Sequence, residues 1–418
     1  MIRKGSIFLP VIVALLLLAM VNPGAASAGG PIGDAIPIFT DNADQVHADV
    51  AYNPHRQQYL VVWYNDRPSN DDIYARRLSR DGKLLSWAAI SAGPGAERRY
   101  PQVAYNHARD EYLVVWEHHD GGRPNIRARR VRWDGVPLGG EILLGTGALA
   151  NRQRPVIGYA QTSDNYLVAW ERLVQGSPAK DIEVQVLTSL GALDGASRVV
   201  AEGTWSVSHE KPDLAYNRSR NENLVASEWL NLSTGEYDVY GRLLEAHGGF
   251  LGKPIFPIYV DAGPDRSPAV AAIPTPAVAN QGQYLIVWTS LWSAGNADIY
   301  GRRMSGQGSM NGPVLWIGPT GGTAANPAVA GSEGAREYLV AWNEVVSHPH
   351  SAVHARTVSM DGEFTSETRR LWWSYSDRPA VASGPLGDFL TAFQFQNPDW
   401  DIYGRFWGNR VYLPLVVR

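Results

Sequence analysis

The chain has 418 residues, no cysteine and a formal net charge of -4 at pH 7. The lack of cysteine excludes disulfides, thiolate metal sites and a cysteine nucleophile, and the negative charge argues against a nucleic-acid partner. Hydrophobic residues make up 44% of the chain and charged residues 19%, so we expect a folded core rather than disorder.

Residues 1–28 have the pattern of a secretory signal peptide. A positively charged start precedes an apolar stretch over residues 7–21, and Ala26-Ser27-Ala28 supplies a small-residue cleavage site. The alternative is a membrane anchor, but the apolar stretch is shorter than the about 20 residues that a span requires. We therefore predict a secreted or cell-surface protein with no membrane contact after cleavage.

The segment that follows, residues 29–46, contains a strand-like run but belongs to no repeat. Its part Ile36–Asp41 resembles residues 255–261, which lie just before a later repeat. We predict that residues 29–46 supply the outer strand of the last repeat, because that repeat has no outer strand of its own.

A repeat of about 50 residues fills the rest of the chain. Its most constant part is a Tyr-Leu-Val-Val-Trp run, followed by a polar loop, an Asp-Ile-Tyr-Gly-Arg run and a turn. We count seven copies, and in the fourth the Trp is displaced by one position, which indicates a bulge or a substitution. The aromatic residues that mark the copies are Trp63, Trp116, Trp170, Trp229, Trp288, Trp342 and Phe393.

Each repeat contains four short runs rich in Val, Ile, Tyr and Trp, separated by turn residues, as in a propeller blade. The second run is apolar on both faces, which is typical of strands buried between layers. The first run carries a small residue in all seven copies, as expected where inner strands converge on an axis. We predict an all-β fold, a seven-bladed β-propeller of four-stranded antiparallel blades over residues 47–407, with the ring closed by the N-terminal strand.

The repeat YLVVW…DIYGRR resembles the repeats of secreted bacterial β-propeller proteins, over about residues 36–407. The resemblance implies the propeller fold and export but little about activity. The WD40, kelch and sialidase-type signatures are absent. Residues 408–418 form a C-terminal tail, either a tail of the kind found on exported bacterial proteins or an extra edge strand.

Charged positions that recur in almost every repeat are interpreted as structural, because an active site does not need six copies. We interpret Asp72 and its equivalents as turn residues, and Glu117 and Glu171 as exposed loop positions rather than catalytic carboxylates. We assign no catalytic residue, no metal ligand and no cofactor. The recurring arginines, interpreted as links between strands or blades, are Arg76, Arg129, Arg242, Arg302, Arg356 and Arg405.

One set of residues outside the constant pattern suggests a ligand. The loops that enter the blades carry cations, and the same predicted face carries aromatic residues, which together suit the apolar faces and hydroxyls of sugars. The competing interpretation is that the cations tie loops to blades and the aromatic rings cover blade edges. The predicted rim consists of Arg99, Arg154, Lys211, Arg266, Arg378, Tyr100, Trp205, Trp292, Tyr375 and Trp400.

We therefore predict an exported, monomeric, non-catalytic binding or scaffold propeller whose partner is a glycan or an extracellular protein or peptide. One alternative is a carbohydrate-active enzyme, either a glycoside hydrolase or a polysaccharide lyase. Another is a structural cell-envelope protein. A carboxylate pair at the channel mouth would favour the enzyme, and an aromatic patch would favour the binding module.

Overall fold

The computed structural model describes residues 29–408 except for 69, 146–148, 253, 262, 275–281, 294, 319–321, 348–349 and 373–374. The predicted signal peptide and all but the first residue of the predicted tail lie outside the described residues. Every element in the described part is a β-strand, and no helix there is long and apolar enough to cross a membrane.

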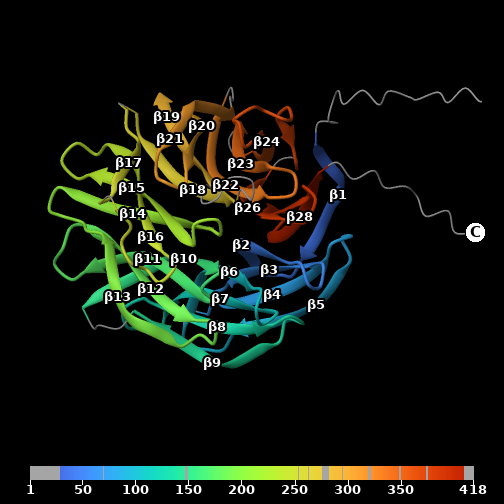
Figure 1. Cartoon of the computed structure of the whole chain (residues 1–418). Coiled ribbons are helices and arrows are strands. Elements are labelled where there is room, and N and C mark those ends of the chain that lie inside the picture. The colour runs from blue at the N-terminus through green and yellow to red at the C-terminus, as the bar shows by residue number, and fades with distance from the viewer. Residues whose placement is uncertain are drawn as a thin grey trace, which may run out of the picture.

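Seven inner strands surround a central channel, which makes the fold a β-propeller (Figure 1). Each inner strand packs against the next, and β26 packs against β2, so the ring is continuous. The inner strands are β2 (Asp44–Asn53), β6 (Glu97–Asn106), β10 (Ala150–Ala160), β14 (Val207–Asn217), β18 (Asp265–Ile273), β22 (Thr323–Ser332) and β26 (Ser376–Ser383).

The second strands are the most deeply buried part of each unit. In β3 every residue from Gln58 to Tyr64 is buried, because both faces of the sheet pack against neighbouring sheets. This confirms the two-sided apolar pattern of the sequence. The second strands are β3 (Gln58–Asp66), β7 (Glu111–His119), β11 (Asn165–Val174), β15 (Glu222–Asn231), β19 (Gln283–Ser293), β23 (Glu337–Ser347) and β27 (Phe389–Gln396).

The third and outer strands complete the sheets, and all pairings within a unit are antiparallel. The third strands are β4 (Asp72–Ser79), β8 (Asn125–Arg132), β12 (Lys180–Thr188), β16 (Tyr237–Glu245), β20 (Asn296–Ser305), β24 (His350–Ser359) and β28 (Trp400–Gly408). The outer strands are β5 (Leu84–Ser91), β9 (Pro137–Leu144), β13 (Leu193–Ala201), β17 (Phe256–Tyr259), β21 (Met310–Gly318), β25 (Arg369–Arg370) and β1 (Gly30–Phe39).

The N-terminal strand β1 lies antiparallel to β28, the last strand of the chain, as the sequence predicts (Figure 1). The pairing runs from Gly30 opposite Gly408 to Phe39 opposite Ile402. Ile38 is completely buried in the cluster between this sheet and the first unit. The two ends of the folded ring are therefore joined by hydrogen bonds and by a shared core.

The prediction of seven separate four-stranded blades is wrong. The strands form five separate four-stranded sheets and one eight-stranded sheet. The larger sheet arises because Thr323, at the start of β22, forms a parallel bridge with Ala297 of β20, and the Thr323 hydroxyl donates to the Gly295 carbonyl. The fifth and sixth repeats are thus joined edge to edge as well as face to face.

The displaced Trp229 results from a substitution. The register between β15 and β16 is continuous, so no residue is inserted. Leu224 lies opposite Ala215 as Leu60 lies opposite Ala51, which places Ser227 at the position of the repeat Trp. Trp229 instead stacks on Tyr240, with ring centroids 5.4 Å apart.

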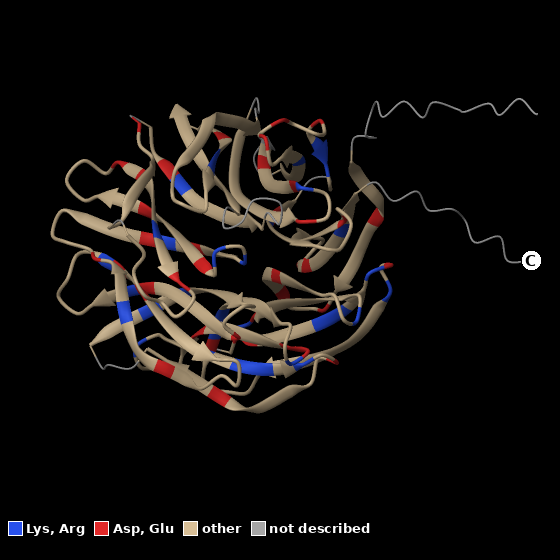
Figure 2. Cartoon of the chain, in the orientation of Figure 1, with Lys and Arg blue, Asp and Glu red and all other residues tan. Residues whose placement is uncertain are grey.

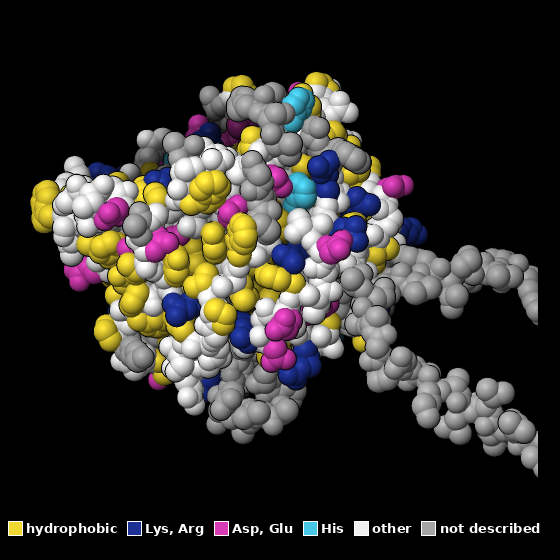
Figure 3. Space-filling view, turned by 90° about the horizontal axis from the view of Figure 1, so that it is seen from above, with side chains coloured by type: hydrophobic (Ala, Val, Ile, Leu, Met, Phe, Trp, Pro, Cys, Tyr) yellow, Lys and Arg dark blue, Asp and Glu magenta, His cyan; other side chains and the backbone are white. Residues whose placement is uncertain are grey.

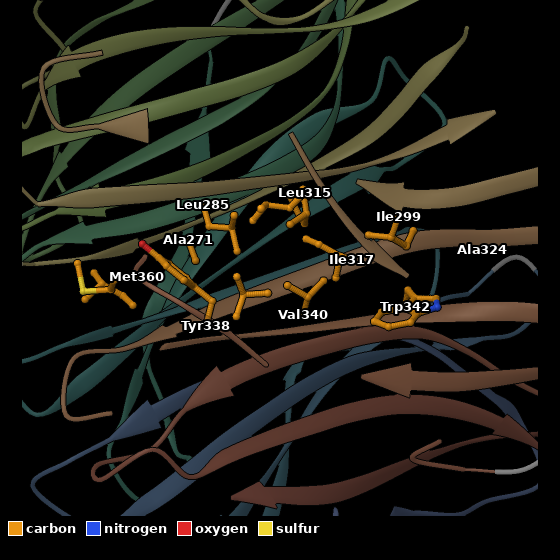
Figure 4. Packing of buried hydrophobic residues seen from close by; sticks show 14 residues of the cluster. Ala271, Leu285, Ile299, Leu315, Ile317, Ala324, Tyr338, Val340, Trp342 and Met360 are labelled. Carbon is orange, nitrogen blue, oxygen red and sulfur yellow. The ribbon is translucent and has the colours of Figure 1, made fainter. Parts of the chain in front are cut away.

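Packing between neighbouring sheets supplies the core. Between the fifth and sixth repeats, Leu285 and Ile317 face Val340 and Trp342 in one buried cluster (Figure 4). All four side chains are completely buried. Similar clusters lie between the other neighbouring sheets, so stability is distributed around the ring.

The recurring arginines link neighbouring sheets, which confirms their structural interpretation. In each case Nη1 donates to a backbone carbonyl of the preceding unit's outer strand or of the segment beside it. The bonds are Arg76 to Ile38 (2.9 Å), Arg129 to Ile90 (2.8 Å), Arg242 to Val200 (3.0 Å), Arg302 to Ile258 (2.7 Å), Arg356 to Ile317 (3.2 Å) and Arg405 to Leu371 (2.5 Å).

Several hydrophobic side chains on the outside of the ring cover these arginines. The Arg242 guanidinium lies 3.8 Å from the ring centroid of Phe250, and that of Arg356 lies 3.6 Å from the ring centroid of Phe364. Both rings remain partly exposed. These two exposed rings therefore belong to the links between sheets. Figure 3 shows that hydrophobic groups also gather over one side of the molecule.

We predict that removing residues 29–42 lowers the melting temperature sharply, because the last sheet loses its outer strand and the ring loses its closure. The single change Ile38→Ala should cost about 2–5 kcal/mol, since it leaves a cavity in a fully buried site. Thermal and urea unfolding measure both effects.

Asp34→Ala is the matched control, because Asp34 lies on the same strand with an exposed side chain. It should change stability by less than about 0.5 kcal/mol. A melting curve unchanged by the deletion would contradict closure by β1.

Candidate functional site

Each inner strand contains a bulge at the same mouth of the channel. In the first unit, Val46 lies opposite Tyr64 and Asp49 lies opposite Val62. β2 therefore has two residues between these pairs where β3 has one, which is a β-bulge. One residue in each bulge has a positive φ, between 44° and 53°, although none is glycine. Proline follows this bulge residue in six of the seven strands. The bulge residues are His47, Tyr100, Arg154, Lys211, Ser267, Asn326 and Arg378.

Side chains of the preceding unit hold the bulges in place. In four of the seven units, the residue that follows the position of the repeat aromatic residue accepts the backbone N–H of the next unit's bulge residue. The three carboxylate examples are Glu117 to Arg154 N (3.1 Å), Glu171 to Lys211 N (2.8 Å) and Glu228 to Ser267 N (2.6 Å). Each hydrogen bond offsets part of the strain of a positive φ at a residue with a side chain.

This role corrects the interpretation of Glu117 and Glu171 as exposed loop positions. Both side chains are buried, because each glutamate lies within a second strand that is enclosed on both faces. Glu228 belongs to the same column, and the displaced Trp229 concealed it in the sequence.

Three of the bulge residues are cations that reach the channel mouth. The side chains of Arg154, Lys211 and Arg378 are 43%, 33% and 44% exposed. Each has an acidic neighbour, at 3.7 Å for Arg154 and Glu171, 2.9 Å for Lys211 and Glu228, and 3.7 Å for Arg378 and Asp377. The cations are thus oriented by carboxylates and still present N–H groups to the channel.

Two ring systems complete this side of the mouth. The rings of His47 and Tyr100 meet edge to face, with centroids 4.5 Å apart, and the Arg154 guanidinium lies 5.2 Å from the Tyr100 centroid. Arg378 Nη1 lies 3.2 Å from His47 Nδ1. Burial and the nearby Arg378 and Arg154 lower the pKa of His47 to about 3, so its imidazole is neutral and accepts this hydrogen bond.

The bulge residues surround a cavity of about 420 Å³. Its size lies within the range of small-molecule sites. Ribbon positions of Lys or Arg and of Asp or Glu lie near one another around the middle of the ring (Figure 2), and the ion pairs of Arg154, Lys211 and Arg378 join such positions. The surface is therefore rich in hydrogen-bond donors and acceptors.

Two carboxyl groups line the channel wall below the mouth. Asp49 and Asp213 each lie two residues after a bulge residue. Burial raises the pKa of Asp49 to about 7 and that of Asp213 to about 6. Hydrogen bonds from backbone N–H groups partly oppose this shift in pKa.

Four of the ten predicted rim residues meet at this cavity, namely Tyr100, Arg154, Lys211 and Arg378. Arg99 and Arg266 do not line it. Arg99 pairs with Asp71 at 2.5 Å, and Arg266 lies 3.7 Å from the ring centroid of Tyr237. Both precede the bulge residue by one position, and each instead contacts a residue of the preceding unit.

The other predicted aromatic residues of the rim lie outside the cavity lining. Trp205 and Trp292 are 81% and 59% exposed. Tyr375 packs against His350 with ring centroids 4.9 Å apart, and Trp400 covers the core between the first two units. Of the predicted aromatic residues, the structure brings only Tyr100 to the lining of this cavity.

Sequence reasoning missed His47, Ser267 and Asn326, together with Asp49 and Asp213. The sequence did contain a signal for this site, because a proline follows six of the seven bulge residues. Aligning the repeats on that proline places the bulge residues at one equivalent position. Within the described ranges, no group of three or more His, Asp or Glu residues could hold a metal ion.

Comparisons with known proteins bear on the fold. No family model and no curated protein matches the chain. A protein of unknown function from Dyadobacter fermentans DSM 18053 is similar in structure, with a TM-score of 0.55 and 11% identity over 92% of this chain and 100% of that one. Because the identity is low, this likeness supports the fold alone.

Two enzyme structures show weaker likeness. An N-acetylgalactosamine deacetylase from F. plautii has a TM-score of 0.42 and 13% identity over 68% of this chain and 91% of that one. An endo-arabinase from Bacteroides thetaiotaomicron VPI-5482 has a TM-score of 0.37 and 11% identity over 70% of this chain and 100% of that one.

We predict that Asp49→Asn raises stability at alkaline pH and leaves it unchanged at acidic pH. A raised pKa means that the folded state binds the proton more tightly, so wild-type stability falls as pH rises from about 4 to about 7. The amide removes this dependence while its oxygen still accepts the Val103 N–H. Because water in the channel screens the charge, we expect a gain of about 1–2 kcal/mol at pH 8.

Urea unfolding across this pH range measures the effect. Asp194→Asn is the control, because Asp194 is exposed on the outer strand β13. A loss of stability of equal size at every pH would contradict the prediction.

Proposed function

We propose that the protein is a secreted or cell-surface binding module that recognises a glycan at the bulged mouth of its channel. The observation that carries this proposal is the convergence of Tyr100, Arg154, Lys211 and Arg378 on one cavity. They lie on four equivalent bulges, so the backbone positions each of them in the same way.

The chemistry of the mouth suits a polyhydroxylated ligand. Sugar hydroxyls can accept from the guanidinium and ammonium groups, and can donate to the carboxyl groups and to the amide oxygen of Gln102 below them. The Tyr100 ring offers a surface for the apolar face of a sugar. Ser267 and Asn326 extend the polar lining to the far side of the mouth.

The cations are arranged for binding rather than for holding the sheets together. The links between sheets are made by the separate arginine column, whose guanidinium groups are turned to the outer strands. Arg154 and Arg378 have only long contacts, 3.7 Å, to their carboxylates. Arg154 can therefore donate to a ligand while its carboxylate contact remains, and Arg378 has further N–H donors besides the one that it gives to His47.

A second candidate function is glycoside hydrolysis, which Asp49 and Asp213 favour. Two carboxyl groups with different pKa values are the usual requirement of that reaction. One oxygen of each is fixed by a backbone N–H, at 2.8 Å for Asp49 and 2.7 Å for Asp213. Product analysis after long incubation with a bound oligosaccharide separates the enzyme from the binding module, because only the enzyme shortens the ligand.

We predict that the double change Arg154→Gln and Arg378→Gln weakens glycan binding by at least about tenfold, since two charged donors are lost from the mouth. A glycan array first identifies a ligand of the wild type, and calorimetry then compares the affinities.

Arg266→Gln is the matched control. Arg266 precedes a bulge residue but lies against Tyr237 instead of lining the cavity, so its loss should leave affinity within about twofold. Equal loss in both variants, or unchanged binding in the double variant, would overturn the assignment of the site.

A further inference from the structure

Asp49 and Asp213 break the repeat at a position that faces the channel. The other five units carry Gln102, Val156 or alanine there, so no common structural requirement demands a carboxyl group. β2 and β14 are three strands apart in the ring of seven inner strands, which places the two carboxyl groups across the channel from one another. The negative charge of Asp213 is close enough to raise the pKa of Asp49 further.

Backbone hydrogen bonds fix both groups without neutralising them. Val103 N donates to Asp49 Oδ2 at 2.8 Å, and Val270 N donates to Asp213 Oδ2 at 2.7 Å. Neither aspartate forms an ion pair with a cation of the described chain. Two enclosed carboxyl groups without a cationic partner are costly, and a cationic ligand would remove that cost.

The cations at the channel mouth pair with other carboxylates and not with Asp49 or Asp213. Arg154, Lys211 and Arg378 are already oriented by Glu171, Glu228 and Asp377. Lys180 lies 2.8 Å from Glu171 and 3.4 Å from Glu210, so it too is occupied. The charge that is missing from the channel is therefore positive.

Two observations favour an organic cation over a metal ion. Calcium takes six to eight oxygen ligands, and only two side-chain carboxyl groups face the channel at this level. An ammonium group has three donors and can donate to these carboxyl groups while the rest of the ligand remains at the mouth. The cavity of about 420 Å³ has room for the end of an oligosaccharide.

We propose that the ligand is an amino sugar oligomer whose ammonium group enters the channel between Asp49 and Asp213 while its hydroxyls bind the donors of the mouth. This inference rests on the proposed glycan binding and specifies its substrate class. A peptide with a lysine side chain offers the same ammonium group but lacks the hydroxyls that the mouth is equipped to bind.

The test compares two oligomers of equal length, one of glucosamine and one of N-acetylglucosamine, which differ in the charge of the amino group. Calorimetry with the full chain, at a pH where the amine is charged and with chelator present, should show at least about tenfold tighter binding of glucosamine. Asp49→Asn and Asp213→Asn should each remove this preference. Asp194→Asn, on an exposed outer strand, should retain it.

The outcomes separate this inference from the proposed function. Equal binding of both oligomers that neither Asn variant changes would overturn the amino-sugar inference and leave glycan binding intact. Binding of a lysine oligopeptide but of no saccharide would overturn both. Circular dichroism and melting curves show that each variant is folded, and because the two aspartates lie on different strands, one variant suffices if the other does not fold.

Discussion

The bulge on each inner strand is the constraint on which the site depends. A non-glycine residue at positive φ costs free energy, and a following proline narrows its backbone freedom further. Buried glutamates stabilise this conformation by accepting the strained residue's N–H from the neighbouring unit. The same bond that fixes the backbone also aims the side chain into the channel, so the binding surface is formed by the packing of one sheet on the next.

Ring closure makes this arrangement rigid without disulfides. Six arginines join six of the seven units to the unit before, and β1 joins the last unit to the start of the chain. The bulge contacts also cross between units. One of them runs from His47 N to Gln394, across the junction that β1 closes. The geometry of the channel mouth therefore relies on closure at the chain termini, although β1 itself lies at the outer edge of the ring.

Features that recur in every repeat could be predicted from the sequence. Features that depend on a single residue in one repeat could not. The strands, the small residues of the inner strands and the arginine links follow from periodic positions. The conclusion that seven sheets are separate failed because a single bridge at Thr323 joins two of them, and one bridge leaves no periodic signal. Arg99 and Arg266 were predicted at the mouth because they lie where a loop enters a blade, close to the first strand. They do not line it because each precedes a bulge residue, and a bulge turns successive side chains in different directions.

Glu228 shows why alignment by the most prominent residue is unsafe. Trp229 looked like the repeat Trp, and aligning on it moves the strand by two positions from the observed register. Pairing with β14 restores Ser227 to the Trp position and places Glu228 in the column of Glu117 and Glu171. Burial of those glutamates could not be inferred either, because a carboxylate at a strand end is usually exposed and becomes buried only through a partner in the next unit.

The departures from symmetry carry the functional argument. Seven equivalent positions below the mouth could all be small or apolar, as Val156, Ala269, Ala328 and Ala380 are. Two of them instead hold aspartates, each enclosed and each without a cation of the described chain beside it. Folding alone does not require this, since five units form the same bulge with other residues. The two carboxyl groups therefore make opposite parts of the channel wall negative, whereas the equivalent positions of the other five units carry no charge.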